Sequence, residues 1–217
     1  MARNTTKDYD ANLNKTIFDI KHQRTFCMIK PDGVMRGLIG EIIHRIEKAG
    51  MKIVAMKMLI PTEEMIKKHY PTSDEKWIAR LGTKAKSGLD GTGLVAKEVY
   101  GTDDEHELGE HALAGLIEYM QSGPVVAMVV EGLQSIEMVR KIAGATLPVK
   151  ADMGTVRGDF SVDSPVVANV EGRSIHNLMH ASENVAEAEN EIKLWFGGET
   201  VCNYSLGNDE VMYCKHY

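Results

Sequence analysis

The order in which strand-like and helix-like segments follow one another is the strongest constraint on how this chain folds. Short apolar runs bounded by turn residues are typical of buried strands. They occur at residues 25–29, 51–60 and 124–130, and a fourth strand is expected within 154–162. Segments with apolar residues at helical spacing alternate with them, near residues 38–49, 107–120, 135–143 and 185–195. This order predicts an α/β fold, a ferredoxin-like βαββαβ sandwich with a largely antiparallel four-stranded sheet and added helices.

The chain suits one domain preceded by an extension. Its 217 residues are 43% hydrophobic, and a chain of this size buries about 70% of its unfolded surface. Residues 1–23 are polar with little periodicity and are interpreted as an N-terminal extension, whereas 24–217 form the domain. The net charge of −6 argues against a general nucleic-acid binder, and no apolar run approaches the roughly 20 residues of a membrane span.

Cysteine usage favours a cytoplasmic protein. Cys27, Cys202 and Cys214 are odd in number and stand at no metal-like spacing. Cys27 lies in an apolar run, where a buried thiol acts as a small hydrophobe. Reduced thiols and the lack of an apolar targeting run in residues 1–23 favour the cytoplasm.

Residues 71–106 are the least regular part of the chain. Thr72 and Glu75 form a capping-box pattern that predicts a helix through Arg80. The Gly- and Lys-rich stretch 84–93 is then expected to be an exposed loop.

Three short motifs carry the chemistry. They are Lys30-Pro31-Asp32-Gly33-Val34, Gly154-Thr155-Val156-Arg157-Gly158-Asp159-Phe160 and Asn177-Leu178-Met179-His180-Ala181-Ser182-Glu183. Each alone is a weak signal, but together and in this order they resemble the signature of nucleoside diphosphate kinases. The resemblance covers roughly residues 24–70 and 107–196, omitting 161–174. It implies a kinase that takes the γ-phosphate of ATP onto His180 and gives it to a nucleoside diphosphate in a ping-pong reaction.

A histidine is chemically suited to carry phosphate. Imidazole exists in its neutral, nucleophilic form near neutral pH, and a phosphoryl group needs fixed cations and donors around it. The sequence places His180 in a link between a strand region and the start of a helix, where peptide N–H groups favour an anion. Taken alone, such a histidine is more often structural; the three motifs together reverse those odds.

The resemblance also implies a set of nucleotide-binding residues. They are Lys30, Arg140, Thr146, Arg157 and Asn177, with Trp77 as a weakly held candidate for stacking on the base. Lys30 and Asn177 would contact the sugar, Lys30 would also reach phosphate, and a guanidinium fork matches phosphate geometrically. Considered singly, the charged residues could equally be solvated surface side chains, and Asn177 a turn residue.

Further residues are implied around the histidine. Glu191 would orient the imidazole, as a carboxylate does in other sites, and Ser182 and Tyr70 would lie beside it. The simpler interpretations are an acidic helix stripe for Glu191, a helix cap for Ser182 and helix-end packing for Tyr70. Mg²⁺ would be held mainly by the nucleotide phosphates, with Glu183 as a weak candidate for an outer-sphere ligand.

Two expansions, near residues 71–106 and 161–174, depart from the family's usual length. Relatives form hexamers or tetramers, so the resemblance implies a homo-oligomer whose small-molecule partners are ATP and nucleoside diphosphates. The alternative is a catalytically silent nucleotide-binding or scaffolding domain of the same fold. Such a domain need not keep a nucleophile, so the presence of His180 among the cations favours the enzyme.

Overall fold

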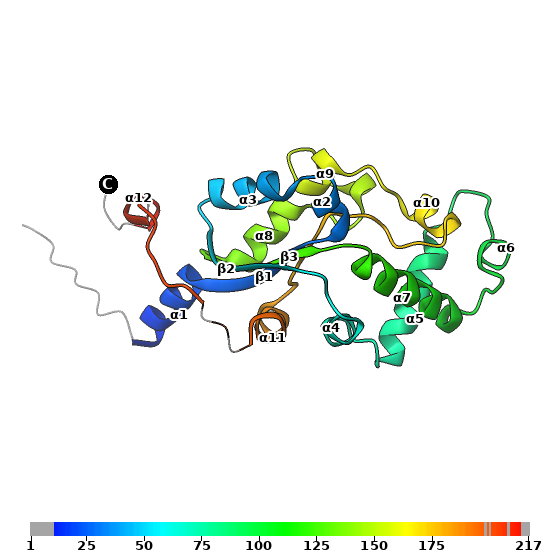
Figure 1. Ribbon diagram of the computed structural model, residues 1–217, viewed down its shortest axis with the longest axis horizontal. Helices are drawn as coiled ribbons and strands as arrows, with labels where there is room; N and C mark the ends of the chain where they lie inside the picture. The colour runs from blue at the N-terminus through cyan, green and yellow to red at the C-terminus, as the bar shows by residue number, and fades with distance from the viewer. Residues whose placement is uncertain (1–10, 198, 200, 208, 214–217) are drawn as a thin grey trace, which may run out of the picture.

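The computed structural model describes residues 11–197, 199, 201–207 and 209–213. Its centre is a four-stranded antiparallel sheet with the order β2-β3-β1-β4 (Figure 1). The strands are β1 (Gln23–Ile29), β2 (Lys52–Leu59), β3 (Val125–Gly132) and β4 (Met179–Ala181). The helices nearest the sheet are α2 (Pro31–Met35), α3 (Ile39–Lys48), α4 (Glu63–His69), α8 (Ser135–Ala143), α9 (Val156–Phe160) and α11 (Val185–Phe196). The predicted fold class is confirmed.

Both faces of the sheet are covered by helices. Along β1, Cys27 and Ile29 point to one face, where α3, α8 and α9 pack, and Phe26 and Met28 point to the other. The second face is covered by α4, α11 and the end of a longer helix, α7 (Glu105–Gln121). Because both faces are covered where the central strand β3 runs, every residue of β3 is buried, which explains its largely apolar sequence.

One predicted strand is wrong. Residues 156–160 form the short helix α9, because the Thr155 side chain accepts a hydrogen bond from the Gly158 amide and starts a helical turn. The fourth strand is instead β4, which pairs with β1 so that His180 lies opposite Met28. The expectation that His180 lies in a link is therefore also wrong, because it sits in the middle of an edge strand.

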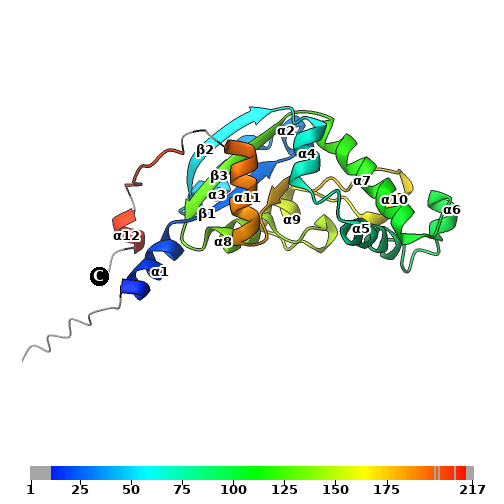
Figure 2. The same cartoon turned by 90° about the horizontal axis from the view of Figure 1, so that it is seen from below.

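The irregular region after β2 is mostly helical. It contains α5 (Glu75–Ser87) and α6 (Ala96–Tyr100), and we call α5, α6 and α7 the outer helices. Asp74, rather than Thr72, caps α5, and the helix runs to Ser87, so the expected loop begins later than predicted. In Figures 1 and 2, α5 and α7 lie side by side at the end of the molecule remote from α1.

The remaining elements lie around this core. They are α1 (Ala11–Lys21), the 3₁₀ turn η1 (Pro148–Lys150), α10 (Pro165–Val170) and α12 (Asp209–Tyr213). Part of the region interpreted as an extension is thus the helix α1, while residues 1–10 and Cys214 lie outside the described residues. None of the described helices combines the length and the apolar character that crossing a membrane requires.

Candidate active site

The imidazole of His180 is held by one carboxylate. Its Nε2 lies 2.7 Å from Oε1 of Glu191, a buried residue of α11. The other carboxylate oxygen of Glu191 accepts a 2.6 Å hydrogen bond from the Ser182 hydroxyl. In a neutral imidazole only one nitrogen carries hydrogen, so a proton on Nε2 leaves Nδ1 with a free lone pair. Glu191 thus selects the tautomer in which the lone pair of Nδ1 is available to an electrophile.

Ser182 does not cap the last helix. Asn184 caps α11, and its side chain accepts from the Glu187 amide. Ser182 is fully buried, and besides binding Glu191 its hydroxyl lies 3.1 Å from the carbonyl oxygen of Phe26 in β1. The hydroxyl therefore ties the carboxylate of α11 to the sheet and fixes its direction.

The environment keeps His180 neutral. Burial, together with the positive charges of Lys30 and the two arginines of the site, lowers the pKa of His180 to about 3. Because the ring becomes a cation only below that pH, it is unprotonated at neutral pH, which is the form of imidazole that can attack an electrophile. Burial also raises the pKa of Glu191, opposed by the neighbouring His69 and by the hydrogen bond from Ser182.

Lys30 emerges at the end of β1 and meets Asn177. Its ammonium donates a 2.8 Å hydrogen bond to Oδ1 of Asn177, and both side chains are buried. Burial and the charge of Arg157 lower the pKa of Lys30 to about 8, although Asp32 opposes the shift. Lys30 remains a cation at neutral pH, but with a smaller margin than a surface lysine.

Arg157 is built into the floor of the site. Its guanidinium donates to three backbone carbonyls, of Gly144, Asn177 and Met179. These bonds use three of its five N–H groups and orient the plane, so two N–H groups remain for a ligand. Gly144 adopts a φ of 81°, which favours glycine, and a side chain there would collide with Thr155.

These groups line one cavity of about 640 Å³. Arg140 and Thr146 reach it from α8 and the segment that follows, and both are exposed. Another part of the lining is more apolar and comes from the turn after α4, from α5 and from α7. Its members are Tyr70, Pro71, Trp77, Leu81, Lys84 and Leu116. A larger hollow beside α1 contains none of the residues expected at the site.

All the residues expected at the site line this cavity except Ser182, which lies beneath it. Tyr70 and Trp77 are stacked at 6.2 Å between ring centroids, so Trp77 lies close to the histidine end. Glu183 is exposed at the rim of the cavity, where its amide donates to the Glu187 carboxylate.

Sequence reasoning missed His69. Its ring lies 4.6 Å from that of His180, and its Nδ1 is 3.3 Å from the Glu191 oxygen that His180 also contacts. Burial and the neighbouring His180 lower the pKa of His69 to about 3, so this ring too is neutral. The one signal in the sequence was its spacing of three from the apolar Ile66, which suggests a shared helix face but does not say what that face meets.

Asp32 was quoted in a motif without a role. Its carboxylate accepts from the Tyr119 hydroxyl at 2.6 Å and from the Leu178 amide at 3.1 Å. Leu178 has a φ of 69°, which side chains rarely adopt, and it lies between Asn177 and β4. Asp32 thus holds a strained residue in place two positions before His180.

Comparison of the sequence with protein families and with known proteins points to one family. The family model described as nucleoside diphosphate kinase matches residues 23–88 and 94–201. A nucleoside diphosphate kinase from Pyrobaculum aerophilum is 47% identical over 179 residues, covering 82% of this chain and 97% of the relative. One from Borreliella burgdorferi is 40% identical over 195 residues, covering 90% and 97%.

Solved structures give the same result. A crystal structure of an NDP kinase from Pyrobaculum aerophilum has a TM-score of 0.79 at 45% identity, covering 84% of this chain and all of that one. A transition-state mimic of the Borrelia burgdorferi kinase with bound vanadate and ADP has a TM-score of 0.69 at 39% identity, covering 90% and 99%. The kinase of Halobacterium salinarum in complex with CDP has a TM-score of 0.63 at 31% identity, covering 88% and 99%.

Proposed function

The chain belongs to the nucleoside diphosphate kinase family, and we propose that it moves the γ-phosphate of ATP, or of another nucleoside triphosphate, to a nucleoside diphosphate. The observation that carries this proposal is a neutral imidazole whose Nε2 is engaged by Glu191, in a cavity to which Lys30, Arg140 and Arg157 bring positive charge. A phosphoryl acceptor needs both the free lone pair on Nδ1 and the surrounding positive charge.

The reaction proceeds in two matched steps. The Nδ1 lone pair attacks the γ-phosphorus, a P–N bond forms, and the P–O bond to the diphosphate leaving group breaks. After ADP departs, a terminal oxygen of the second diphosphate attacks the same phosphorus and the P–N bond breaks. Since both steps use one cavity in turn, the kinetics are ping-pong.

Different residues of the cavity bind different parts of the nucleotide. Arg140, Arg157 and Thr146 bind the phosphates, where spread negative charge develops during transfer. Lys30 and Asn177, which are hydrogen-bonded to each other, contact the ribose and the adjoining phosphate. Tyr70 lies beside the histidine, and Trp77 with Leu81 and Leu116 forms an apolar wall on which a base can lie.

Mg²⁺ fits this donor set as a companion of the nucleotide. The cavity is lined by cations at the phosphate end, and Glu183 and Glu187 lie at its rim. Mg²⁺ keeps most of its waters and is bound largely by phosphate oxygens, so one rim carboxylate suffices as an outer-sphere partner. When bound, the ion neutralises phosphate charge, and Glu183 is the residue that would hold its water.

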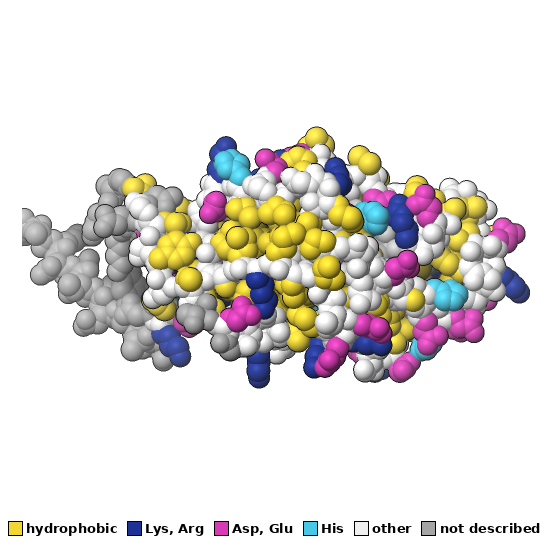
Figure 3. Space-filling view, in the orientation of Figure 1, with side chains coloured by type: hydrophobic (Ala, Val, Ile, Leu, Met, Phe, Trp, Pro, Cys, Tyr) yellow, Lys and Arg dark blue, Asp and Glu magenta, His cyan; other side chains and the backbone are white. Residues whose placement is uncertain are grey.

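A homo-oligomer, hexameric or tetrameric, is part of the proposal. β2 is an edge strand, its second half carries the exposed apolar side chains Met56 and Met58, and the exposed Ile60 follows it directly. Figure 3 shows apolar side chains gathered on this face of the molecule. An exposed apolar edge is a site for pairing with another chain.

The free thiols Cys27 and Cys202 suit a cytoplasmic location.

The test is formation of a phosphohistidine. The protein is incubated with γ-labelled ATP and Mg²⁺, and an acid-labile, alkali-stable phosphoprotein is expected that transfers its label to added GDP. His180→Ala should abolish the label, whereas His111→Ala, an exposed histidine of α7, should keep it. A protein that binds nucleotide but takes no label would be the silent scaffold, and the kinase proposal would fail.

A further inference from the structure

One face of α5 forms part of the cavity wall. Trp77, Leu81 and Lys84 stand at positions i, i+4 and i+7, so they lie on the same side of the helix. All three line the cavity that contains His180. Lys84 is therefore a cavity residue, although the Gly- and Lys-rich sequence around it indicated an exposed loop.

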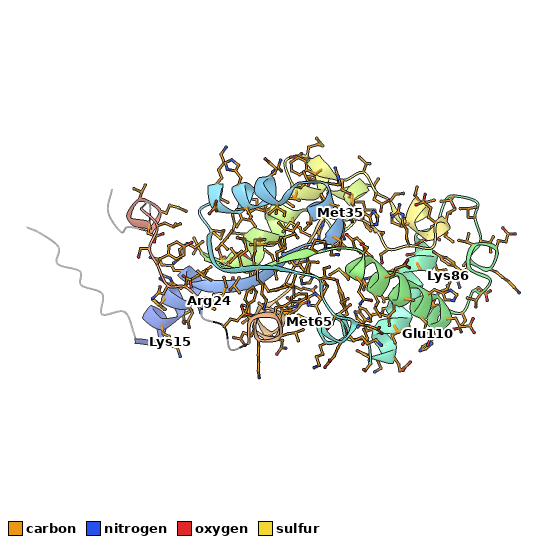
Figure 4. All side chains as sticks on the ribbon, in the orientation of Figure 1. Lys15, Arg24, Met35, Met65, Lys86 and Glu110 are labelled. Carbon is orange, nitrogen blue, oxygen red and sulfur yellow. The ribbon has the colours of Figure 1, made fainter. Side chains whose placement is uncertain are left out.

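The ammonium of Lys84 is available to a ligand. Among the described residues no carboxylate pairs with it and no hydrogen bond engages it. Lys86, two positions along the same helix and labelled in Figure 4, differs in this respect. It does not line the cavity, and its ammonium donates to the carbonyl oxygen of Asp103 at 3.2 Å. The two lysines lie on the same helix and differ in that only Lys84 lines the cavity, so Lys86 can serve as the control for Lys84.

Lys84 lies at the end of the wall away from the nucleophile. A series of rings connects His180 through His69 and Tyr70 to Trp77, with centroid separations of 4.6, 4.6 and 6.2 Å. Along α5, Leu81 and Lys84 follow Trp77, and seven residues of helix span about 10 Å. A nucleotide with its phosphates at His180 and its base on this wall extends toward Lys84.

The hydrogen-bonding groups on the edge of a base determine whether it can accept a hydrogen bond from a cationic side chain. Guanine at position 6, and uracil and thymine at position 4, present a carbonyl oxygen that accepts hydrogen bonds, whereas adenine and cytosine present an amino group that donates them. A lysine has only donors. Building on the proposed kinase activity, we propose that Lys84 is a specificity-determining residue that favours nucleoside diphosphates with oxo bases over those with amino bases.

The experiment isolates the acceptor step. Phosphoenzyme is prepared with ATP, freed of nucleotide and mixed with IDP, ADP, UDP or CDP, and the second-order rate of loss of the phosphohistidine is measured. IDP and ADP share ribose, phosphates and purine rings and differ at position 6; UDP and CDP differ likewise at position 4. Ratios within each pair therefore cancel every contact except the one at the base edge.

The unaltered protein should favour IDP over ADP and UDP over CDP by about fivefold, the size of one hydrogen bond to a solvent-exposed cation. Lys84→Met should bring both ratios to about one, Lys84→Arg should keep them, and Lys86→Met should leave them at the unaltered values. Ratios unchanged by Lys84→Met, or a uniform loss across all four diphosphates, would overturn the role in base choice while leaving the kinase intact. Failure to form any phosphoenzyme would instead overturn the proposed function itself.

Discussion

The carboxylate of Glu191 determines which nitrogen of His180 can act. Its Oε1 contacts both His180 and His69, and its Oε2 accepts from Ser182, so three side chains converge on one buried acid. A carboxylate with this many partners has one orientation. The imidazole that donates to it is fixed with its other nitrogen toward the cavity. Positioning, more than any single strong contact, is what these residues contribute.

Glu191→Gln should lower kcat by about 10- to 100-fold, as loss of a residue that orients a reactive group commonly does. The amide can still accept from Nε2, but it no longer carries the charge that stabilises the donating ring. Steady-state kinetics give the value, and the fraction of protein phosphorylated at equilibrium gives a second readout. Glu189→Gln, an exposed acid of the same helix, is the matched control. Equal kcat values for both variants would contradict the orienting role.

Activity should fall at high pH because Lys30 loses its proton. The pKa of Lys30 is lowered to about 8, so the cation is present below that pH and lost as pH rises through it. kcat/KM for the nucleoside diphosphate reports the free enzyme and should decline above about pH 8. In Lys30→Arg the guanidinium stays charged, so the decline should move to higher pH. An identical alkaline limb in both proteins would assign it to another group.

Among the helices and strands, the sequence predicted those whose apolar residues recur with a clear period. β1, β2 and β3 and helices α3, α8 and α11 each have enough residues to display an apolar pattern, and all were expected close to their observed bounds. β4 has only three residues, too few for alternation to show. α9 has five, and its apolar Val156 and Phe160 resemble a strand unless the capping role of Thr155 is recognised.

The residues of the candidate site likewise fall into those that the sequence could locate and those that it could not. Residues inside the motifs could be located from sequence because their neighbours identify them, and Lys30, Arg157 and His180 do line one cavity. His69 and Lys84 could not, because their importance depends on which helix face turns inward. Packing of α4 against α11 and of α5 against α7 determines that orientation, and neither contact is local in sequence.

Close packing of α5 on α7 should make Gly109 intolerant of a side chain. A Cβ at Gly109 would press on the carbonyl of Ile78 in α5, and one at Gly82 on the carbonyl of Glu105. Backbone atoms cannot move aside cheaply, so Gly109→Ala should destabilise the protein by about 1–3 kcal/mol. A denaturant titration measures the free energy of unfolding.

The control for this prediction is Gly40→Ala in α3, where a Cβ meets nothing within 4 Å. Alanine there should stabilise the protein by about 0.5–1 kcal/mol through helix propensity. Were Gly109→Ala to behave like Gly40→Ala, the two helices would not approach as closely as the structure has them.

For the whole molecule, the exposed half of β2 is the feature that most needs a partner. Its first half is already covered, because the Cys202 amide donates to the carbonyl of Val54 and the Tyr204 hydroxyl donates to that of Ile53. Beyond Ala55 the strand has solvent on its outer side and carries two half-exposed methionines, Met56 and Met58. The edge is therefore open over the stretch that is most apolar.

Replacing both methionines by glutamate should weaken self-association, because like charges would face each other across a symmetric interface. Light scattering coupled to gel filtration should give a lower mass for Met56→Glu/Met58→Glu than for the unaltered protein. Leu94→Glu places a charge on an exposed apolar residue near α6 and should keep the original mass. An unchanged mass for the double variant would place the interface elsewhere.

The two walls of the catalytic cavity have different origins in the fold. The side chains for which we propose phosphate binding stand at the end of β1, on helices packed against the sheet or in the segment after α8, whereas Trp77, Leu81 and Lys84 belong to a helix held mainly by α7. Evolution can therefore alter one wall without disturbing the other. A chimera that received α5 and its connections from a relative would inherit that relative's nucleotide preference while retaining this chain's own turnover.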